Sequence, residues 1–223
     1  MKINSISVLA CIAFITCGCA TERSLQSGPD AEVTFDGLYR VNNSAMEYAW
    51  AKPDINLGAY TKILPLSAGI EYRAVRGGTR YSARSGDTEF PLNDEQKARL
   101  EEAVSEVFRD ELGKSEHFKI TDKTGPDVLL VRGELLDVVS KVPPEPIGRG
   151  NIYLTEIGEA TLVLELRDSQ SLEIFARAAD RRAAEPATGG VRSSPVTSVS
   201  EVRRLARRWA RLLREGLDEM HGI

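Results

Sequence analysis

The chain has 223 residues, of which 29 are Lys or Arg and 33 are Asp or Glu, so its formal net charge is −4. Acidic and basic residues are interspersed, and this balance argues against a nucleic acid as the partner. The 3 cysteines, Cys11, Cys17 and Cys19, all lie near the start and the chain has 2 histidines, which excludes a disulfide-stabilised body and a histidine-rich metal site.

Residues 1–18 have the layout of a bacterial secretory signal. Lys2 gives a positive start, and an apolar run extends from Ile6 to Ile15. This run is too short to cross a bilayer as a helix. Gly18 directly precedes Cys19, so the pattern predicts that the signal is removed and that Cys19 becomes the acylated first residue of a lipoprotein.

One residue of this signal departs from the usual form, because Thr16 stands where lipoprotein signals typically carry Leu. A plain secretory signal, or cleavage at another position, is the alternative. Residues 19–32 are rich in Ser, Gly, Pro and charge, and they predict a flexible acylated tether. Ala20 and Thr21 follow the cysteine, where an Asp often retains bacterial lipoproteins in the inner membrane. By that resemblance the periplasmic face of the outer membrane is favoured, in a Gram-negative host.

Residues 33–223 are long enough for one self-standing α/β domain. A first strand is expected at 60–66, and 73–89 predicts a loop or an exposed hairpin. A helix then begins after Asn93 as N-cap, with Gln96 at the capping-box position, and ends at Gly113. Its apolar residues recur every three or four positions, which places one stripe against a core: Leu100, Ala103, Val104, Val107, Phe108 and Leu112.

Four further strands are expected over residues 117–121, 127–142, 153–168 and 172–182, with loops at 143–150 and 185–197. The strand at 153–168 alternates, which predicts one buried and one solvent-facing side. Its buried set is Ala160, Leu162, Leu164 and Leu166, and its solvent-facing set is Glu159, Thr161, Glu165 and Arg167. Residues 168–171 predict the hairpin turn into the last strand.

The chain closes with a predicted helix from Val199 to Met220, for which Ser198 and Glu201 form a candidate cap. Its apolar stripe is Val202, Leu205, Ala206, Trp209, Leu212, Leu213 and Leu217, and its opposite side carries Arg203, Arg204, Arg207, Arg208, Arg211 and Arg214. A basic amphipathic helix can lie on an anionic bilayer, but the stripe is what a sheet needs to cover its buried face. A core helix is therefore favoured, with Arg203, Arg204, Arg207 and Arg211 as a candidate interaction surface.

In this order, the elements predict an α+β fold. We expect a largely antiparallel sheet of about four to five strands with two amphipathic helices packed on one face.

Four stretches of the chain resemble the DUF3313 family of bacterial lipoproteins. They are Phe35-Asp36-Gly37-Leu38, Tyr60-Thr61-Lys62, Glu165-Leu166-Arg167-Asp168 and the closing helix with Trp209-Ala210. The resemblance implies an exported, acylated α/β domain of uncharacterised function. It transfers no catalytic residue.

No catalytic, cofactor-binding or metal-binding residue is expected. His117 lies beside a predicted strand, His221 lies near the end of the chain, and no G-x-S-x-G motif is present. Glu165 and Asp168 lie near a strand end, where a glycosidase could place its carboxylates, but the pattern predicts a solvent-facing residue and a turn residue.

Two function classes remain open. The first is a membrane-anchored envelope lipoprotein with a non-catalytic interaction domain, held by acyl chains and binding an envelope protein, an anionic lipid or a glycan. The second is a domain that binds or hydrolyses cell-wall material or a small ligand. A concave free sheet face lined by aromatic residues favours the second class, and a flat or polar face favours the first.

Overall fold

The computed structural model describes residues 23–75, 88–143, 153–186, 191–192 and 195–221. Cys19 lies outside these residues. The predicted loops at 73–89 and 143–150 also lie largely outside them. The predicted loop at 185–197 is wrong in part, because its described residues include a two-residue strand, β10 (Val191–Arg192), and the start of the closing helix at Pro195.

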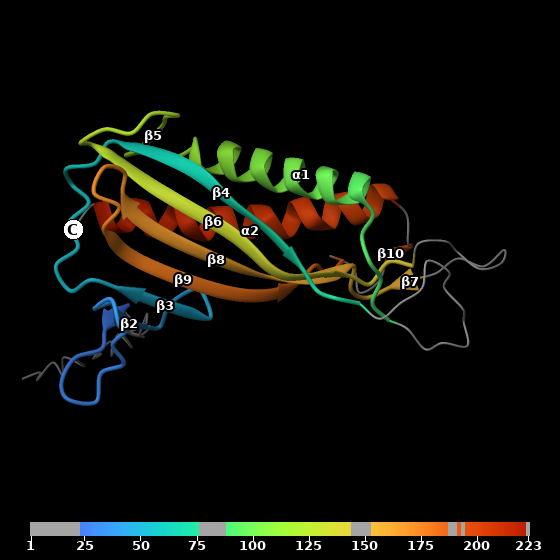
Figure 1. Cartoon of the computed structure of the whole chain (residues 1–223), viewed down its shortest axis with the longest axis horizontal. Coiled ribbons are helices and arrows are strands. Elements are labelled where there is room, and N and C mark those ends of the chain that lie inside the picture. The colour runs from blue at the N-terminus through green and yellow to red at the C-terminus, as the bar shows by residue number, and fades with distance from the viewer. Residues whose placement is uncertain (1–22, 76–87, 144–152, 187–190, 193–194, 222–223) are drawn as a thin grey trace, which may run out of the picture.

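An eight-stranded mixed sheet forms the body of the fold, in the order β1-β2-β3-β9-β8-β6-β4-β5 (Figure 1). β4 pairs in parallel with β5 and β6, and the remaining pairs of this sheet are antiparallel. The strands are β1 (Ser24–Leu25), β2 (Tyr39–Asn42), β3 (Tyr48–Ala51), β4 (Lys62–Tyr72), β5 (Lys119–Ile120), β6 (Val128–Ser140), β8 (Gly158–Asp168) and β9 (Ile174–Ala183). A separate two-stranded sheet joins β7 (Tyr153–Leu154) to β10 (Val191–Arg192).

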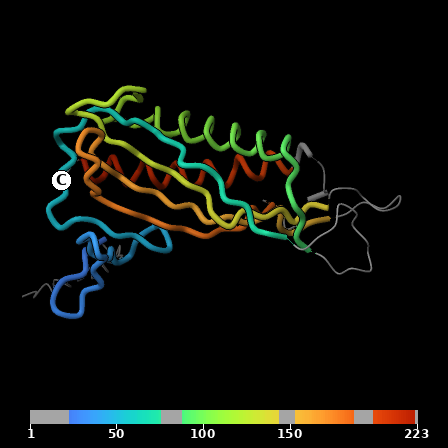
Figure 2. Tube along the Cα trace, in the orientation of Figure 1, coloured from blue at the N-terminus to red at the C-terminus, as the bar shows by residue number. Residues whose placement is uncertain are grey.

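Two helices, α1 (Asp94–Leu112) and α2 (Pro195–His221), cover one face of the large sheet, and no helix of the described residues lies on the other face, which we call the helix-free face (Figures 1 and 2). Trp209 and Leu217 of α2 are buried against strand residues such as Leu129, Leu135 and Leu162. The predicted fold class is confirmed, but the predicted strand number is wrong. The short strands β1, β2 and β3, which no periodic pattern marks, extend the sheet beyond β9.

The start and end of α1 are confirmed. Asn93 accepts a hydrogen bond from the Gln96 amide at 2.8 Å, while the Gln96 side chain accepts one from the Asn93 amide at 2.9 Å. These reciprocal bonds satisfy two amides that a helix start leaves free. Gly113 ends the helix, and its amide donates to the Arg109 carbonyl at 3.0 Å.

The hairpin between β8 and β9 is also confirmed. Oδ1 of Asp168 accepts from the amides of Gln170 and Ser171, at 3.0 and 2.6 Å, which fixes the turn. Leu172 closes the turn with a φ of 61°. The predicted apolar set of β8, Ala160, Leu162, Leu164 and Leu166, is buried as expected.

Two predicted boundaries are wrong. Residues 153–168 form two strands in different sheets, and the second begins at Gly158. A Cβ at Gly158 would lie 2.4 Å from the Val139 carbonyl oxygen, so the close approach of the two backbones there requires glycine. The closing helix begins at Pro195, so Ser198 lies inside it and is not its cap. A proline at the first helical position fits, because its missing amide hydrogen has no partner there anyway.

The described part of the predicted tether runs along the edge of the sheet. Ser24 and Leu25 pair with Asn42 and Val41 as β1, and the Gln26 amide donates to the Arg40 carbonyl at 2.8 Å. Arg23, the first described residue, forms an ion pair with Glu219 near the end of α2. The ordered body therefore begins before Val33, where we expected the domain to start.

The outer edge of β4 is poorly suited to adding another strand. β5 pairs with Lys62 and Ile63 of β4, and the next residue on that edge, Pro65, has no amide hydrogen to donate. The register with β6 then shifts at Gly69, which has a φ of 113°. Proline and irregular backbone are common protections of an exposed sheet edge.

Candidate interaction surfaces

The predicted arginine surface on α2 is largely paired with carboxylates. Arg203 contacts Glu106 of α1 at 2.6 Å, and Arg204 contacts Glu201 at 2.6 Å. Arg211 lies 4.0 Å from Glu215, one turn further along α2. Arg207 is exposed and forms no ion pair with a described residue. The row is therefore mostly neutralised, and its four members do not converge on one point.

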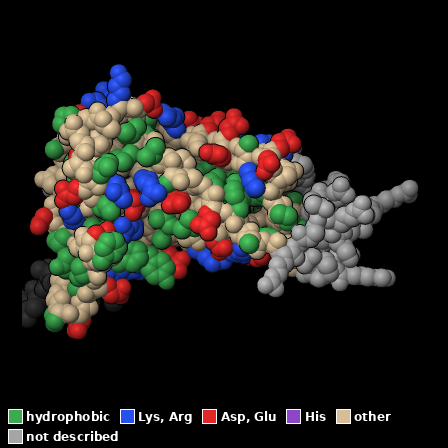
Figure 3. All heavy atoms as spheres, in the orientation of Figure 1, with side chains coloured by type: hydrophobic (Ala, Val, Ile, Leu, Met, Phe, Trp, Pro, Cys, Tyr) green, Lys and Arg blue, Asp and Glu red, His purple; other side chains and the backbone are tan. Residues whose placement is uncertain are grey.

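The helix-free face of the sheet carries a row of side chains that crosses six strands. By register, Arg40 of β2 lies beside Trp50 of β3, which lies beside Arg177 of β9. The row continues through Glu165 of β8 and Arg132 of β6 to Leu66 of β4. We call these six residues the cross-sheet row; Figure 3 shows charged and hydrophobic side chains intermixed on this side of the molecule.

Glu165 is at the centre of the cross-sheet row, and its predicted exposure is wrong, because 8% of the residue is accessible. Its carboxylate is 2.7 Å from Arg167, 3.1 Å from Arg177 and 3.3 Å from Arg132. Burial alone would raise the pKa of Glu165, but hydrogen bonds from these arginines hold it below the ordinary value. The arginines come from three strands, and their long side chains cover the carboxylate.

A second ionic cluster lies toward the other end of the same face. Arg73 donates to Asp137 at 2.7 Å and contacts Glu159 at 2.6 Å. Asp137 lies in a bulge of β6 with a φ of 56°, which turns its carboxylate toward Arg73. Arg181 also contacts Glu159, at 2.8 Å. Arginine hydrogen bonds hold the pKa of Asp137 below its ordinary value, so the cluster is charged and satisfied internally.

Aromatic side chains lie at the β3 end of the helix-free face. Tyr48 and Trp50 stack with ring centroids 5.9 Å apart. The Arg40 guanidinium lies 4.7 Å from the Tyr48 centroid and 4.9 Å from the Trp50 centroid, which are cation–π distances. Tyr48 is 45% exposed, and Leu66 at the opposite end of the cross-sheet row is 49% exposed. The face is thus polar at its centre and apolar at both margins.

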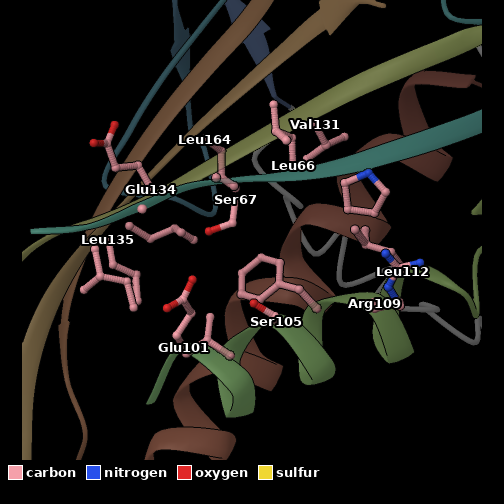
Figure 4. Close-up of a pocket in the computed structure, with 17 residues that line it drawn as sticks. Leu66, Ser67, Glu101, Ser105, Arg109, Leu112, Val131, Glu134, Leu135 and Leu164 are labelled. Atoms are coloured by element: carbon pink, nitrogen blue, oxygen red, sulfur yellow. The ribbon is translucent and has the colours of Figure 1, made fainter. Parts of the chain in front are cut away.

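A groove of about 240 Å³ opens between β4 and α1 (Figure 4). Its walls are mostly apolar and include Phe108, Leu135 and Leu164. Ser67, Glu101 and Ser105 also line it, and their side chains form no hydrogen bond or ion pair with a described residue. The groove is therefore an apolar concavity with a few free polar groups, which is the usual composition of a small-ligand site.

The residues considered for catalysis are occupied by structural contacts. Asp168 accepts from the turn amides and from the Tyr60 hydroxyl, 3.0 Å away. Burial and this contact raise the pKa of Tyr60 to about 12. His117 and His221, which the sequence pattern keeps apart, stack with centroids 4.4 Å apart. Among the described residues, no group of three or more His, Cys, Asp or Glu side chains could hold a metal ion.

The part of the chain that the structure describes contains no helix long and apolar enough to cross a membrane.

Comparison with known proteins identifies the family to which the chain belongs. A family model described as "Protein of unknown function (DUF3313)" matches residues 33–213. The chain is 11% identical to a PelC dodecamer from Paraburkholderia phytofirmans over 74% of this chain and 96% of that one, with a TM-score of 0.35. It is 12% identical to a DUF330 protein from Xanthomonas campestris over 77% and 91% of the two chains, with a TM-score of 0.40. Among curated proteins, none matches the chain.

Proposed function

Because the chain belongs to the DUF3313 family, whose function is unknown, we propose that it is an envelope lipoprotein that acts by binding a protein partner and not by catalysis. Acylation of Cys19 would moor the domain to the outer membrane, on its periplasmic face. The signal-like segment and the Gly18-Cys19 pair support this anchoring.

The observation that carries the binding role is the composition of the cross-sheet row. The three arginines at its centre are balanced only when neighbouring carboxylates are counted: all three contact Glu165, Arg177 also contacts Asp36, and Arg132 lies 3.7 Å from Glu134, so none of the three is left without a counter-charge for an ionic ligand. Tyr48 and Leu66, at the two margins of this face, are 45% and 49% exposed. Tyr, Trp and Arg are enriched in protein interfaces and among their hot spots, so the Arg40, Tyr48 and Trp50 group at one margin is the part of this face best suited to a protein partner.

Site-specific photocrosslinking in intact cells tests this surface. A benzoylphenylalanine placed at Tyr48 or Leu66 of the full chain should form a discrete crosslinked product with one protein. Arg207 is exposed on α2, on the opposite side of the molecule, and a probe there is the matched control. Equal products at all three positions, or none at Tyr48 and Leu66, would contradict a docking role for the helix-free face.

Anchoring is tested separately on native material. Mass spectrometry should find a diacylglycerol-modified Cys19 as the first residue, and palmitate labelling should disappear in a Cys19→Ala variant. An unlipidated start, or undiminished label in the variant, would refute the anchor without touching the docking surface.

The groove between β4 and α1 favours a second candidate function, the binding or hydrolysis of cell-wall fragments. Ser105→Trp places a large side chain in the groove and should abolish any binding of muropeptides that isothermal titration detects. Glu102→Gln is the matched control, because Glu102 is an exposed residue of α1 outside the groove lining. Absence of binding and of turnover by the unmodified chain would eliminate this candidate.

A further inference from the structure

Two exposed apolar turn tips lie at the end of the domain from which the anchor segment departs. We propose that Phe35 and Leu172 insert into the bilayer surface beside the lipid anchor and so fix the tilt of the domain. This inference rests on the proposed acylation of Cys19.

Phe35 is held outward by a rigid turn. The Thr34 amide donates to the Leu38 carbonyl at 2.9 Å, and the Gly37 amide donates to the Thr34 carbonyl at 3.0 Å. Leu38 is fully buried, whereas Phe35 is 98% exposed. Asp36 ties the same turn to Arg177 of β9 at 3.0 Å. A large aromatic side chain that is displayed by an ordered turn, and packs on nothing, is suited to contact with an apolar medium.

Leu172 is the second exposed apolar tip, and packing against other residues does not explain its backbone conformation. Its φ of 61° is in the left-handed region, where Gly and Asn are common and a bulky residue is an outlier. The side chain gains no core contact in return, because the residue is 53% exposed. Strained backbone of this kind often marks a functional position.

The two tips lie at the same end of the sheet. Leu172 is in the turn that joins β8 to β9, and Asp36, next to Phe35, contacts Arg177 near the start of β9. The end of α2 lies at this end as well (Figure 1). There Glu219 pairs with Arg23, the first described residue. The described chain therefore begins at the same end of the domain as both tips.

The length of chain before Arg23 brings this end close to the membrane. Three residues lie between Cys19 and Arg23, and the four steps from one to the other span at most about 14 Å when fully extended. β8 has 11 residues, so the opposite end of the sheet lies about 33 Å further away at a rise of about 3.3 Å per residue. An acylated chain thus holds Phe35 and Leu172 near the bilayer, and the strand β7, which contains Tyr153, lies at the far end of the molecule (Figure 1).

The contact is apolar and not ionic. Lys52 and Arg177, the cations beside the two turns, are paired with Glu173 and Asp36. Lys123 is an exposed cation without an ion pair to a described residue, in the loop whose Gly125 bonds Ser169 near the Leu172 turn, and it can add an attraction to anionic headgroups without being required for insertion. We therefore expect insertion into zwitterionic membranes as well as anionic ones.

Depth-dependent fluorescence quenching tests the proposal on the full, acylated chain. The mature chain has no thiol besides the acylated one, so Phe35→Cys, Leu172→Cys and Tyr153→Cys each give a single labelling site for NBD. Tyr153 is the matched control, since it is 69% exposed at the other end of the molecule. In phosphatidylcholine vesicles with doxyl-labelled lipid, quenching at 35 and 172 should exceed that at 153 by about twofold or more, because inserted groups lie about 5–10 Å deep.

The outcomes separate this proposal from the anchoring on which it rests. Mass spectrometry of the same preparation shows whether the chain is acylated. A chain without lipid overturns the anchor and this inference together. An acylated chain with unquenched probes at 35 and 172, or with equal quenching at 153, overturns this inference alone. Probes that stay unquenched in vesicles but crosslink to a protein in cells also overturn it, and assign the tips to a protein contact.

Discussion

Replacing Asp180 by Asn should destabilise the domain although the side chain keeps its shape. Asp180 is 3% exposed and is the point at which β3, β9 and α2 meet. Its carboxylate accepts from the indole nitrogen of Trp209 at 2.7 Å and from the Glu47 amide at 3.0 Å, and it forms an ion pair with Arg182. The amide group of Asn has one accepting oxygen, so it cannot accept from all these donors and leaves Arg182 without its counter-charge.

The expected loss is about 3 kcal/mol, because removing one partner of a buried charge pair costs about 3–5 kcal/mol and hydrogen bonds to a charged group contribute about 1.5–3 kcal/mol. For a domain of this size that corresponds to a fall in Tm of about 6–12 °C. Urea and thermal unfolding measure it, with Asp54→Asn as the control, since Asp54 is exposed and forms no ion pair with a described residue. A change within about 0.5 kcal/mol, the range of a neutral surface substitution, would refute the assigned role.

Three further predictions concern a buried core residue, the buried carboxylate of β8 and the turn between β8 and β9. Leu129→Ala should lower the free energy of unfolding by about 2–5 kcal/mol, because Leu129 is fully buried, whereas Leu66→Ala should change it by about 0.5 kcal/mol or less in the same urea titration. Arginine hydrogen bonds outweigh burial and hold the pKa of Glu165 below 4.5, so its ionised form stabilises the fold above that pH and this contribution is lost as the pH falls through the folded-state pKa. The stability difference between the unmodified chain and Glu165→Gln should therefore shrink between about pH 7 and about pH 3. Leu172→Asn should raise stability by about 1 kcal/mol, because Asn tolerates a φ of 61° better than Leu, and an unchanged or lower Tm would count against strain at this turn.

Local signals predicted the parts of the fold that local contacts determine. The capping box of α1 and the turn at Asp168 depend on residues within three or four positions of each other, so composition and spacing suffice to find them. The alternation of β8 likewise identified its buried apolar set, although not the burial of Glu165 on the other face. α2 could have been placed correctly from Pro195, because proline at the first turn of a helix is a known start signal.

Contacts between distant segments account for what the sequence analysis missed. β3 has 4 residues and joins the sheet by pairing with β9, more than a hundred positions later in the chain. The alternation of β8 indicates that Glu165 lies on the face opposite the buried apolar set. It does not indicate that arginines from β6 and β9 cover the carboxylate. The ion pair between Arg73 and Glu159 could not be predicted either, because it requires that β4 and β8 lie in the same sheet. A pattern predicts which face a residue occupies, whereas burial depends on its neighbours across the strands.

The sign of the effect at Leu172 distinguishes a structural role from a membrane role. If the Leu172 side chain served packing, its replacement would lower the stability of the domain, as the replacement of Leu129 should. A side chain kept for insertion gives the opposite result, since Asn relieves the backbone strain while removing the apolar group that enters the bilayer. Leu172→Asn should thus raise the Tm of the acylated chain and at the same time reduce the quenching of a probe at Phe35. A lower Tm together with unchanged quenching would assign Leu172 to the fold and leave Phe35 as the single candidate for membrane contact.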